Sequence, residues 1–129
     1  MNTEVQMLVW STVLGLAQIM IALAGLIGKR GLGWAASARD DTVEPVTGMV
    51  ARLDRARANF LETYVFFAAL VLAGCILQRH TAMTMLGAQL YFWARLIYVP
   101  VYALGIPYLR TLIWTVSIVG IVMLLTPLF

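Results

Sequence analysis

The sequence has few charged residues and almost no cysteine. Charged residues make up 12% of its 129 positions, whereas a soluble domain carries about 25%. Hydrophobic residues reach 62%, and the mean hydropathy is +0.89. A soluble chain of this length could not bury so much apolar surface, so a soluble fold is excluded. The single cysteine, Cys75, also excludes a disulfide within the chain.

Several motifs that carry chemistry are also missing. The sequence contains no cluster of metal ligands, no glycine-rich phosphate loop and no nucleophile beside a base. We therefore expect no metal cofactor. The net charge of +3 is spread unevenly along the chain, which favours a membrane-orientation signal over nucleic-acid binding. We expect no nucleic-acid partner.

Four apolar segments dominate the sequence. They are predicted as helices over about residues 5–27, 48–77, 81–104 and 109–125. At about 1.5 Å per residue, the first is long enough to cross a hydrocarbon core of about 30 Å, and it lacks the basic start of a signal peptide. Short breaks at 78–80 and 105–108 force neighbouring helices to run antiparallel. The sequence predicts one all-α integral membrane domain over residues 1–129, a four-transmembrane-helix up-down bundle.

A stripe of small residues marks one face of the first helix. At steps of four and three residues it contains Ser11, Gly15, Gln18, Ala22 and Gly25. Small residues let membrane helices approach closely. We expect this face to pack against another helix.

Basic residues gather around the first loop, residues 29–47, and the start of the second helix. They are Lys29, Arg30, Arg39, Arg52, Arg55 and Arg57. No basic residue precedes the first helix or follows the fourth. The positive-inside rule therefore places this loop in the cytoplasm and both termini on the non-cytoplasmic side. We expect the inner membrane of a bacterium as the location.

Polar side chains share one face of the second helix. They are Arg52, Arg55, Asn59 and Glu62, at steps of three, four and three residues. At about 100° per residue, all four fall within about 80° of one another. Guanidinium groups bind carboxylates in a two-pronged geometry, and a carboxylate such as Glu62 can receive an ammonium group. This face is typical of a site for a small zwitterion with more than one carboxylate.

The third helix carries a second polar stripe. The fourth helix begins on the side of the membrane where the charged second helix begins. The stripe contains Tyr91, Arg95, Tyr98 and Tyr102, and the fourth helix begins near Arg110 and Thr111. An arginine inside a membrane helix costs about 2.5–3.5 kcal/mol on insertion scales. Arg95 therefore needs a partner or a wet cavity, and tyrosine hydroxyls are available at its depth.

Packing explanations of these residues stay open. The arginines of the second helix could anchor it to lipid headgroups. Glu62 could pair with Arg95 only to make both tolerable in the membrane. The tyrosines could form an aromatic belt, although a belt does not require one helix face.

Two stretches of the sequence resemble the MAPEG superfamily of membrane proteins in eicosanoid and glutathione metabolism, which includes microsomal glutathione transferases and prostaglandin E synthase. In the stretch 52–63, Ala56, Asn59 and Glu62 match the pattern Ala-x-x-Asn-x-x-Glu after an arginine-rich helix start. In the stretch 94–102, Arg95 is followed seven residues later by Tyr102. The resemblance extends over nearly the whole chain, and we assign it to the prokaryotic branch.

The resemblance implies a homotrimer in the lipid bilayer with three sites between subunits. It implies glutathione as the bound cosubstrate and a hydrophobic small-molecule electrophile, with transferase or peroxidase activity. The implied glutathione contacts are Arg55, Asn59, Glu62, Arg95 and Tyr102, with Arg30 as a further carboxylate contact. The polar helix faces add Arg52 and Tyr98 as candidate contacts. The implied catalytic residues are Arg110, which stabilises the thiolate, and Thr111 and Tyr102 as hydrogen-bond donors to sulfur.

Two other functions are compatible with the residues themselves. A non-enzymatic trimeric scaffold, or a small-molecule-binding protein of the same fold, would keep the arginines for packing. A small transporter would use Arg95 to line a pathway, but the sequence lacks pairs of broken helices in two matching halves.

Overall fold

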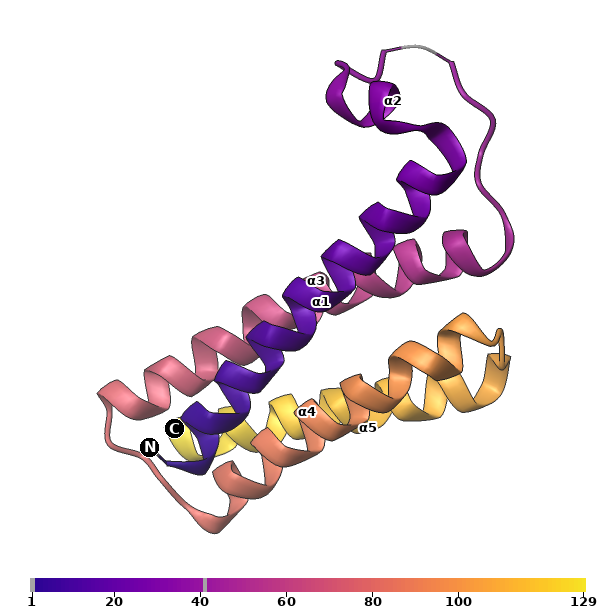
Figure 1. Ribbon diagram of the computed structural model, residues 1–129. Helices are drawn as coiled ribbons and strands as arrows, with labels where there is room; N and C mark the ends of the chain where they lie inside the picture. Colours follow the sequence, from indigo (N-terminus) through magenta and orange to yellow (C-terminus); the bar gives the residue numbers. More distant parts are fainter. Residues whose placement is uncertain (1, 41) are drawn as a thin grey trace.

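The computed structural model describes residues 2–40 and 42–129, and every regular element in these ranges is a helix (Figure 1). The long helices are α1 (Thr3–Arg30), α3 (Gly48–Ile76), α4 (Ala82–Ala103) and α5 (Pro107–Leu125), with a short α2 (Leu32–Ala36) and a final 3-10 turn (Thr126–Leu128). The first helix is longer at both ends than the predicted 5–27. Its length follows from Asn2, whose side chain accepts a hydrogen bond from the Val5 amide at 2.8 Å, and from Gly31, whose φ of 88° ends the helix.

The long helices form two antiparallel pairs that pack against each other. Figure 1 shows α1 beside α3, and α4 beside α5. We call the end that holds Arg52, Arg55 and Arg110 the arginine end. The opposite end, which holds Asn2, Phe129 and the turn at 77–81, is called the terminal end. Consecutive long helices run in opposite directions, as the short turns predict.

Three segments are long and apolar enough to cross a membrane. They are Thr3–Arg30, Gly48–Ile76 and Pro107–Leu128. The fourth helix, α4, has 22 residues, and Gln89 and Arg95 interrupt its apolar sequence. Eleven of its residues are buried, Arg95 among them, so part of its polarity faces other helices. The chain is therefore an integral membrane helical bundle, with three helices that are apolar enough to cross a membrane and a fourth that contains the buried Arg95.

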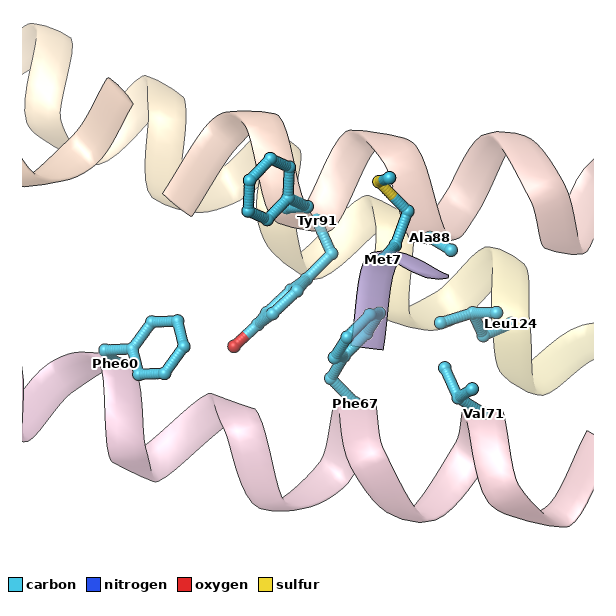
Figure 2. Close-up of a cluster of buried hydrophobic side chains, with 8 residues drawn as sticks. Met7, Phe60, Phe67, Val71, Ala88, Tyr91 and Leu124 are labelled. Atoms are coloured by element: carbon cyan, nitrogen blue, oxygen red, sulfur yellow. The ribbon is translucent and has the colours of Figure 1, made fainter. Parts of the chain in front are cut away.

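The main core lies between the two helix pairs. Its buried residues are Met7, Phe60, Phe67, Val71, Ala88, Tyr91, Phe92 and Leu124. Figure 2 shows Tyr91 reaching from α4 toward α3, with Phe60 on one side and Phe67 on the other. The rings of Phe67 and Tyr91 stack with centroids 4.1 Å apart, and the Tyr91 hydroxyl lies 3.0 Å from that of Thr63. Tyr91 thus belongs to the core.

Two helix contacts depend on glycine. A Cβ at Gly15 would lie 2.8 Å from the Phe60 ring, and its neighbours Ser11 and Ala22 are buried. This confirms the predicted packing face of α1. A Cβ at Gly120 would lie 2.6 Å from the carbonyl oxygen of Gly87, so α4 and α5 touch backbone to backbone.

Candidate functional site at the arginine end

Tyr102 lies at the centre of the arginine end. Arg55 reaches from α3 and donates a hydrogen bond from Nε to the Tyr102 hydroxyl at 3.1 Å. The guanidinium carbon of Arg110, in the first turn of α5, lies 4.7 Å from the centre of the Tyr102 ring. The ring itself is only 9% exposed. Tyr102 therefore holds two cations from two other helices, one at its hydroxyl and one at its face.

Arg52 of α3 is hydrogen-bonded to the turn between α4 and α5. Its Nε donates to the Ala103 carbonyl oxygen at 2.8 Å, where a cation is favoured by the negative end of a helix. Gly105 follows with a φ of 75°, and a Cβ there would lie 3.6 Å from the Arg52 guanidinium. Pro107 then occupies the first turn of α5, where its missing amide hydrogen costs nothing. These contacts fix the spacing between Tyr102 and Arg110.

Two hollows open on either side of Arg110. One has a volume of about 280 Å³, and its lining includes Arg52, Arg55 and Tyr102. The other has a volume of about 190 Å³ and is lined by Asn59, Tyr98, Arg110, Thr111 and Trp114. Because Arg110 lines both hollows, its charge acts on whatever occupies either one.

Arg95 is buried, but its surroundings differ from the prediction. Its guanidinium carbon lies 4.2 Å from the centre of the Tyr98 ring and 5.6 Å from that of Phe60. Among the described residues, none of its three side-chain nitrogens has a hydrogen-bond partner, although the residue is only 1% exposed. The tyrosines thus offer Arg95 a ring face where hydroxyls were expected. It lines neither of the two hollows beside Arg110.

Glu62 has no ion-pair partner within the part of the chain that the structure describes. Its side chain is exposed on α3, while Arg95 is buried. The alternative that these two residues pair to make each other tolerable is therefore wrong for a single chain. Asn59 lies one turn before Glu62, and its Oδ1 atom is buried without a partner in the described ranges.

The family comparison covers the part of the chain that contains this site. The MAPEG family profile matches residues 7–128, which include every candidate site residue. The chain belongs to the MAPEG family. A search of curated proteins found no match. The family match supports the expectation of a membrane enzyme of this class, while assignment to the prokaryotic branch stays a prediction.

In this MAPEG chain, Arg30 lies apart from the other candidate residues. One of its terminal nitrogens donates to the Glu44 carbonyl oxygen at 3.3 Å, and its guanidinium carbon lies 4.7 Å from the centre of the Trp34 ring. It lines neither hollow. Glu62 and Arg95 also line neither hollow. Within one chain the structure therefore brings together Arg52, Arg55, Asn59, Tyr98, Tyr102, Arg110 and Thr111.

The sequence reasoning missed two features of this MAPEG bundle. Trp114 lines the hollow beside Thr111, and its position four residues after Arg110 would have indicated the same helix face. Glu4 is buried at the terminal end, where it accepts a hydrogen bond from the Thr84 hydroxyl at 2.6 Å. His80 Nδ1 lies 3.6 Å from the same carboxylate oxygen. A charge in the first turn of an apolar helix was the available signal.

Proposed function

We propose that this protein is a membrane glutathione transferase, with peroxidase activity as a related outcome, that binds glutathione at the arginine end. The observation that carries the proposal is the position of Arg110. Its guanidinium group lies over the Tyr102 ring and lines both hollows. A fixed cation between two polar hollows is suited to a substrate that has several carboxylates and one reacting atom that becomes anionic.

The unpartnered polar atoms support a peptide ligand with carboxylates and an ammonium group. Arg95 has three buried nitrogens without partners in the described chain, and the Asn59 oxygen is in the same state. Buried polar groups left unpaired are costly, so a ligand that supplies acceptors and donors would be stabilised here. In the proposed complex Arg52, Arg55 and Arg95 bind carboxylates and Glu62 receives the ammonium group. Tyr98 and Tyr102 donate from their hydroxyls, and Arg30 joins from a neighbouring subunit.

The proposed chemistry needs no base on the protein. A free thiol has a pKa near about 8.5, so a small fraction is ionised at neutral pH. A guanidinium group close to the sulfur favours the anion, and lowering the pKa by two units requires about 2.7 kcal/mol of preferential interaction. Arg110 supplies this charge and Thr111 a hydrogen bond. The thiolate sulfur then forms a bond to a hydrophobic electrophile that arrives from the bilayer, and the leaving group departs with its electron pair.

We further propose a homotrimer of four-span subunits with the site between subunits. Arg55 and Glu62 are exposed on α3 in a single chain, and charged side chains on a membrane helix require a polar neighbour. A second chain packed on this face would enclose the open hollows. Native mass spectrometry in mild detergent should show three copies per particle. A dominant monomer or dimer would exclude the shared site.

The proposed orientation places the arginine end in the cytoplasm and both termini outside it. A cysteine introduced as Ser37→Cys, in a Cys75→Ser background, should resist impermeant thiol reagents in intact cells and react after lysis. Ser37 is exposed just after α2, so its reactivity reports only the side of the membrane. Labelling of intact cells would reverse the orientation.

Glutathione titration of the detergent-purified protein tests the function. Thermal stabilisation should rise with ligand concentration, reaching about 2.7 kcal/mol at a hundred times the dissociation constant. Conjugation of a general aryl halide should then be measurable. Ophthalmic acid, which carries a methyl group in place of the thiol, is the matched ligand: it should stabilise the protein without any conjugation.

A non-enzymatic scaffold is the second candidate, and the contact of Arg52 favours it. Arg52 has a partner within its own chain, the Ala103 carbonyl oxygen, which is what a packing role requires. The scaffold predicts no stabilisation by either glutathione or ophthalmic acid. Stabilisation by both ligands with conjugation of glutathione alone would rule it out.

A further inference from the structure

A third hollow lies between α1 and α3, on the other side of α3 from the candidate site. Its volume is about 250 Å³, and its lining residues are Ile19, Ala22, Leu23, Leu26, Arg39, Asp54 and Arg57. At about 100° per residue, Arg57 is turned about 160° away from Arg55 around the helix. The hollow shares no lining residue with the two hollows beside Arg110.

One wall of this hollow is apolar, and its mouth is charged. Four side chains of α1 form the wall at steps of three, one and three residues, from Ile19 to Leu26, which places them along one helix face. The charged groups come from Arg39 in the first loop and from Asp54 and Arg57 at the start of α3. The apolar wall is suited to a lipid acyl chain, and the charged mouth is suited to a lipid headgroup.

The charges at the mouth favour an anion. Arg57 donates from Nε and a terminal nitrogen to one oxygen of Asp54, at 3.0 and 2.9 Å, so this carboxylate is already neutralised by one guanidinium group. Arg39 adds a second positive charge. With two arginines against one aspartate, the lining carries a net positive charge. A phosphate group completes the charge balance.

The depth of the charged groups is that of lipid headgroups. Arg57 precedes Phe60, where the apolar run of α3 begins, and arginines near helix ends extend to the headgroup level. The Arg39 guanidinium carbon lies 4.6 Å from the centre of the Trp34 ring, and tryptophan is enriched at the same level. The two arginines are thus placed where phospholipid phosphates lie.

We propose that the hollow between α1 and α3 binds an anionic phospholipid, with the phosphate at Arg39 and Arg57 and the start of one acyl chain along Ile19, Leu23 and Leu26. The volume is slightly below the range of about 300–1,000 Å³ for pockets that enclose a drug-sized ligand. It is therefore sufficient for the phosphate and the first carbons of the chain, while the rest of the lipid stays in the bilayer. The proposal does not depend on glutathione binding.

Native mass spectrometry with defined lipids tests the proposal. The purified protein is titrated with phosphatidylglycerol or with diacylglycerol of the same acyl chains. Phosphatidylglycerol adducts should predominate for the wild type. The Arg39→Gln/Arg57→Gln variant should lose roughly 30-fold in phosphatidylglycerol binding, and Arg39→Gln alone roughly fivefold, because each basic group near an anionic lipid contributes about that factor. Arg79→Gln, at the terminal end, is the matched control and should bind as the wild type does.

Each contrary result identifies another occupant or none. Equal adducts of the two lipids, or unchanged preference in Arg39→Gln, would overturn the proposal. Displacement by glycerol phosphate at a similar concentration would reveal a site for free phosphate. A changed number of subunits in the variants would reveal an interface between copies. Arg39 is exposed in the first loop, so its single variant decides the question even if the double variant does not fold. Stabilisation by glutathione in the same samples reports the other site separately.

Discussion

The two ends of the bundle differ in whether a buried charged side chain has a hydrogen-bond partner within the chain. At the terminal end, the carboxylate of Glu4 receives a hydrogen bond from Thr84 and lies near His80. At the arginine end, Arg95 is equally buried and has no hydrogen-bond partner in the described chain. Two open hollows lie beside Arg110.

This difference suggests that the terminal end contributes mainly to folding stability and the arginine end mainly to ligand binding. The terminal end joins α1 to α4 through a polar contact within the chain, and the aromatic core packs next to it. The arginine end leaves cations over ring faces, where each interaction contributes only about 0.5–2 kcal/mol. Unpaired buried groups are retained where a ligand pairs with them, so substitutions at the two ends should affect different measurements.

The largest expected effect is at Arg110. Arg110→Ala should lower the rate of conjugation by about 10²–10³, because it removes a preorganised charge beside the developing anion. The pKa of the bound thiol should rise toward its free value, and glutathione binding should be nearly unchanged. Stopped-flow absorbance of the thiolate across pH measures the shift. Arg79→Ala, an arginine of the terminal end, should change neither quantity. Equal thiol pKa values in wild type and Arg110→Ala would leave Tyr102 as the next candidate.

The next effect concerns the two exposed charges of α3. Arg55→Ala and Glu62→Ala should each weaken glutathione binding by about 10- to 100-fold, since a hydrogen bond to a charged group contributes about 1.5–3 kcal/mol. Isothermal titration calorimetry of folded variants measures the affinity. Tyr102→Phe removes the hydrogen bond of Arg55 but keeps the Arg55 charge, so it separates the two contributions. If the affinities of both alanine variants equal that of the wild type, these residues serve packing or lipid contact, and the contrast between the ends disappears.

A smaller effect is expected at the contact between α4 and α5. Gly120→Ala should lower the free energy of unfolding by about 1–3 kcal/mol, because its Cβ would meet backbone atoms of α4 that have no room to move. Gly28→Ala is the matched control: in the described chain no side chain and no other helix lies within 4 Å of its Cβ position, so it should be neutral or stabilising by up to about 1 kcal/mol. Thermal unfolding in detergent compares the two. Equal melting temperatures would contradict the backbone contact.

The smallest effect tests the terminal end directly. Thr84→Val should cost about 1 kcal/mol of stability, because it removes the donor to the buried Glu4 carboxylate and the hydroxyl that accepts a hydrogen bond from the Thr81 amide at the cap of α4. Thr115→Val should cost less, since the Thr115 hydroxyl only returns a hydrogen bond to its own helix and is exposed. Glutathione binding should be unaffected in both. A loss of binding in Thr84→Val would show that the two ends are coupled.

The helices could be predicted from the sequence because their signals are local. Apolar length, the break at 78–80 and the proline at 107 determine where the helices lie within a few residues. The small-residue stripe of α1 also identified its packing face. The status of α4 was harder to predict, because Arg95 and Gln89 lower its hydropathy although Arg95 is covered by neighbouring helices.

The site was only partly predictable, for a different physical reason. Helical periodicity placed Arg55 and Tyr102 on the polar stripes of two helices, and in the structure they are hydrogen-bonded. It could not show that the partner of Arg95 is a ring face, because that depends on the rotation of Tyr98. Nor could it find the contact between Glu4 and Thr84, which are 80 residues apart. Such contacts are determined by how the helix pairs cross.

The backbone contact between Gly87 and Gly120 also limits how the protein can move. Two helices that touch without intervening side chains cannot slide past each other without losing that contact. Tyr102 at the end of α4 and Arg110 at the start of α5 therefore move as one body. Amide exchange should accordingly be slow along α4 and α5, and faster at 48–52, the first turn of α3.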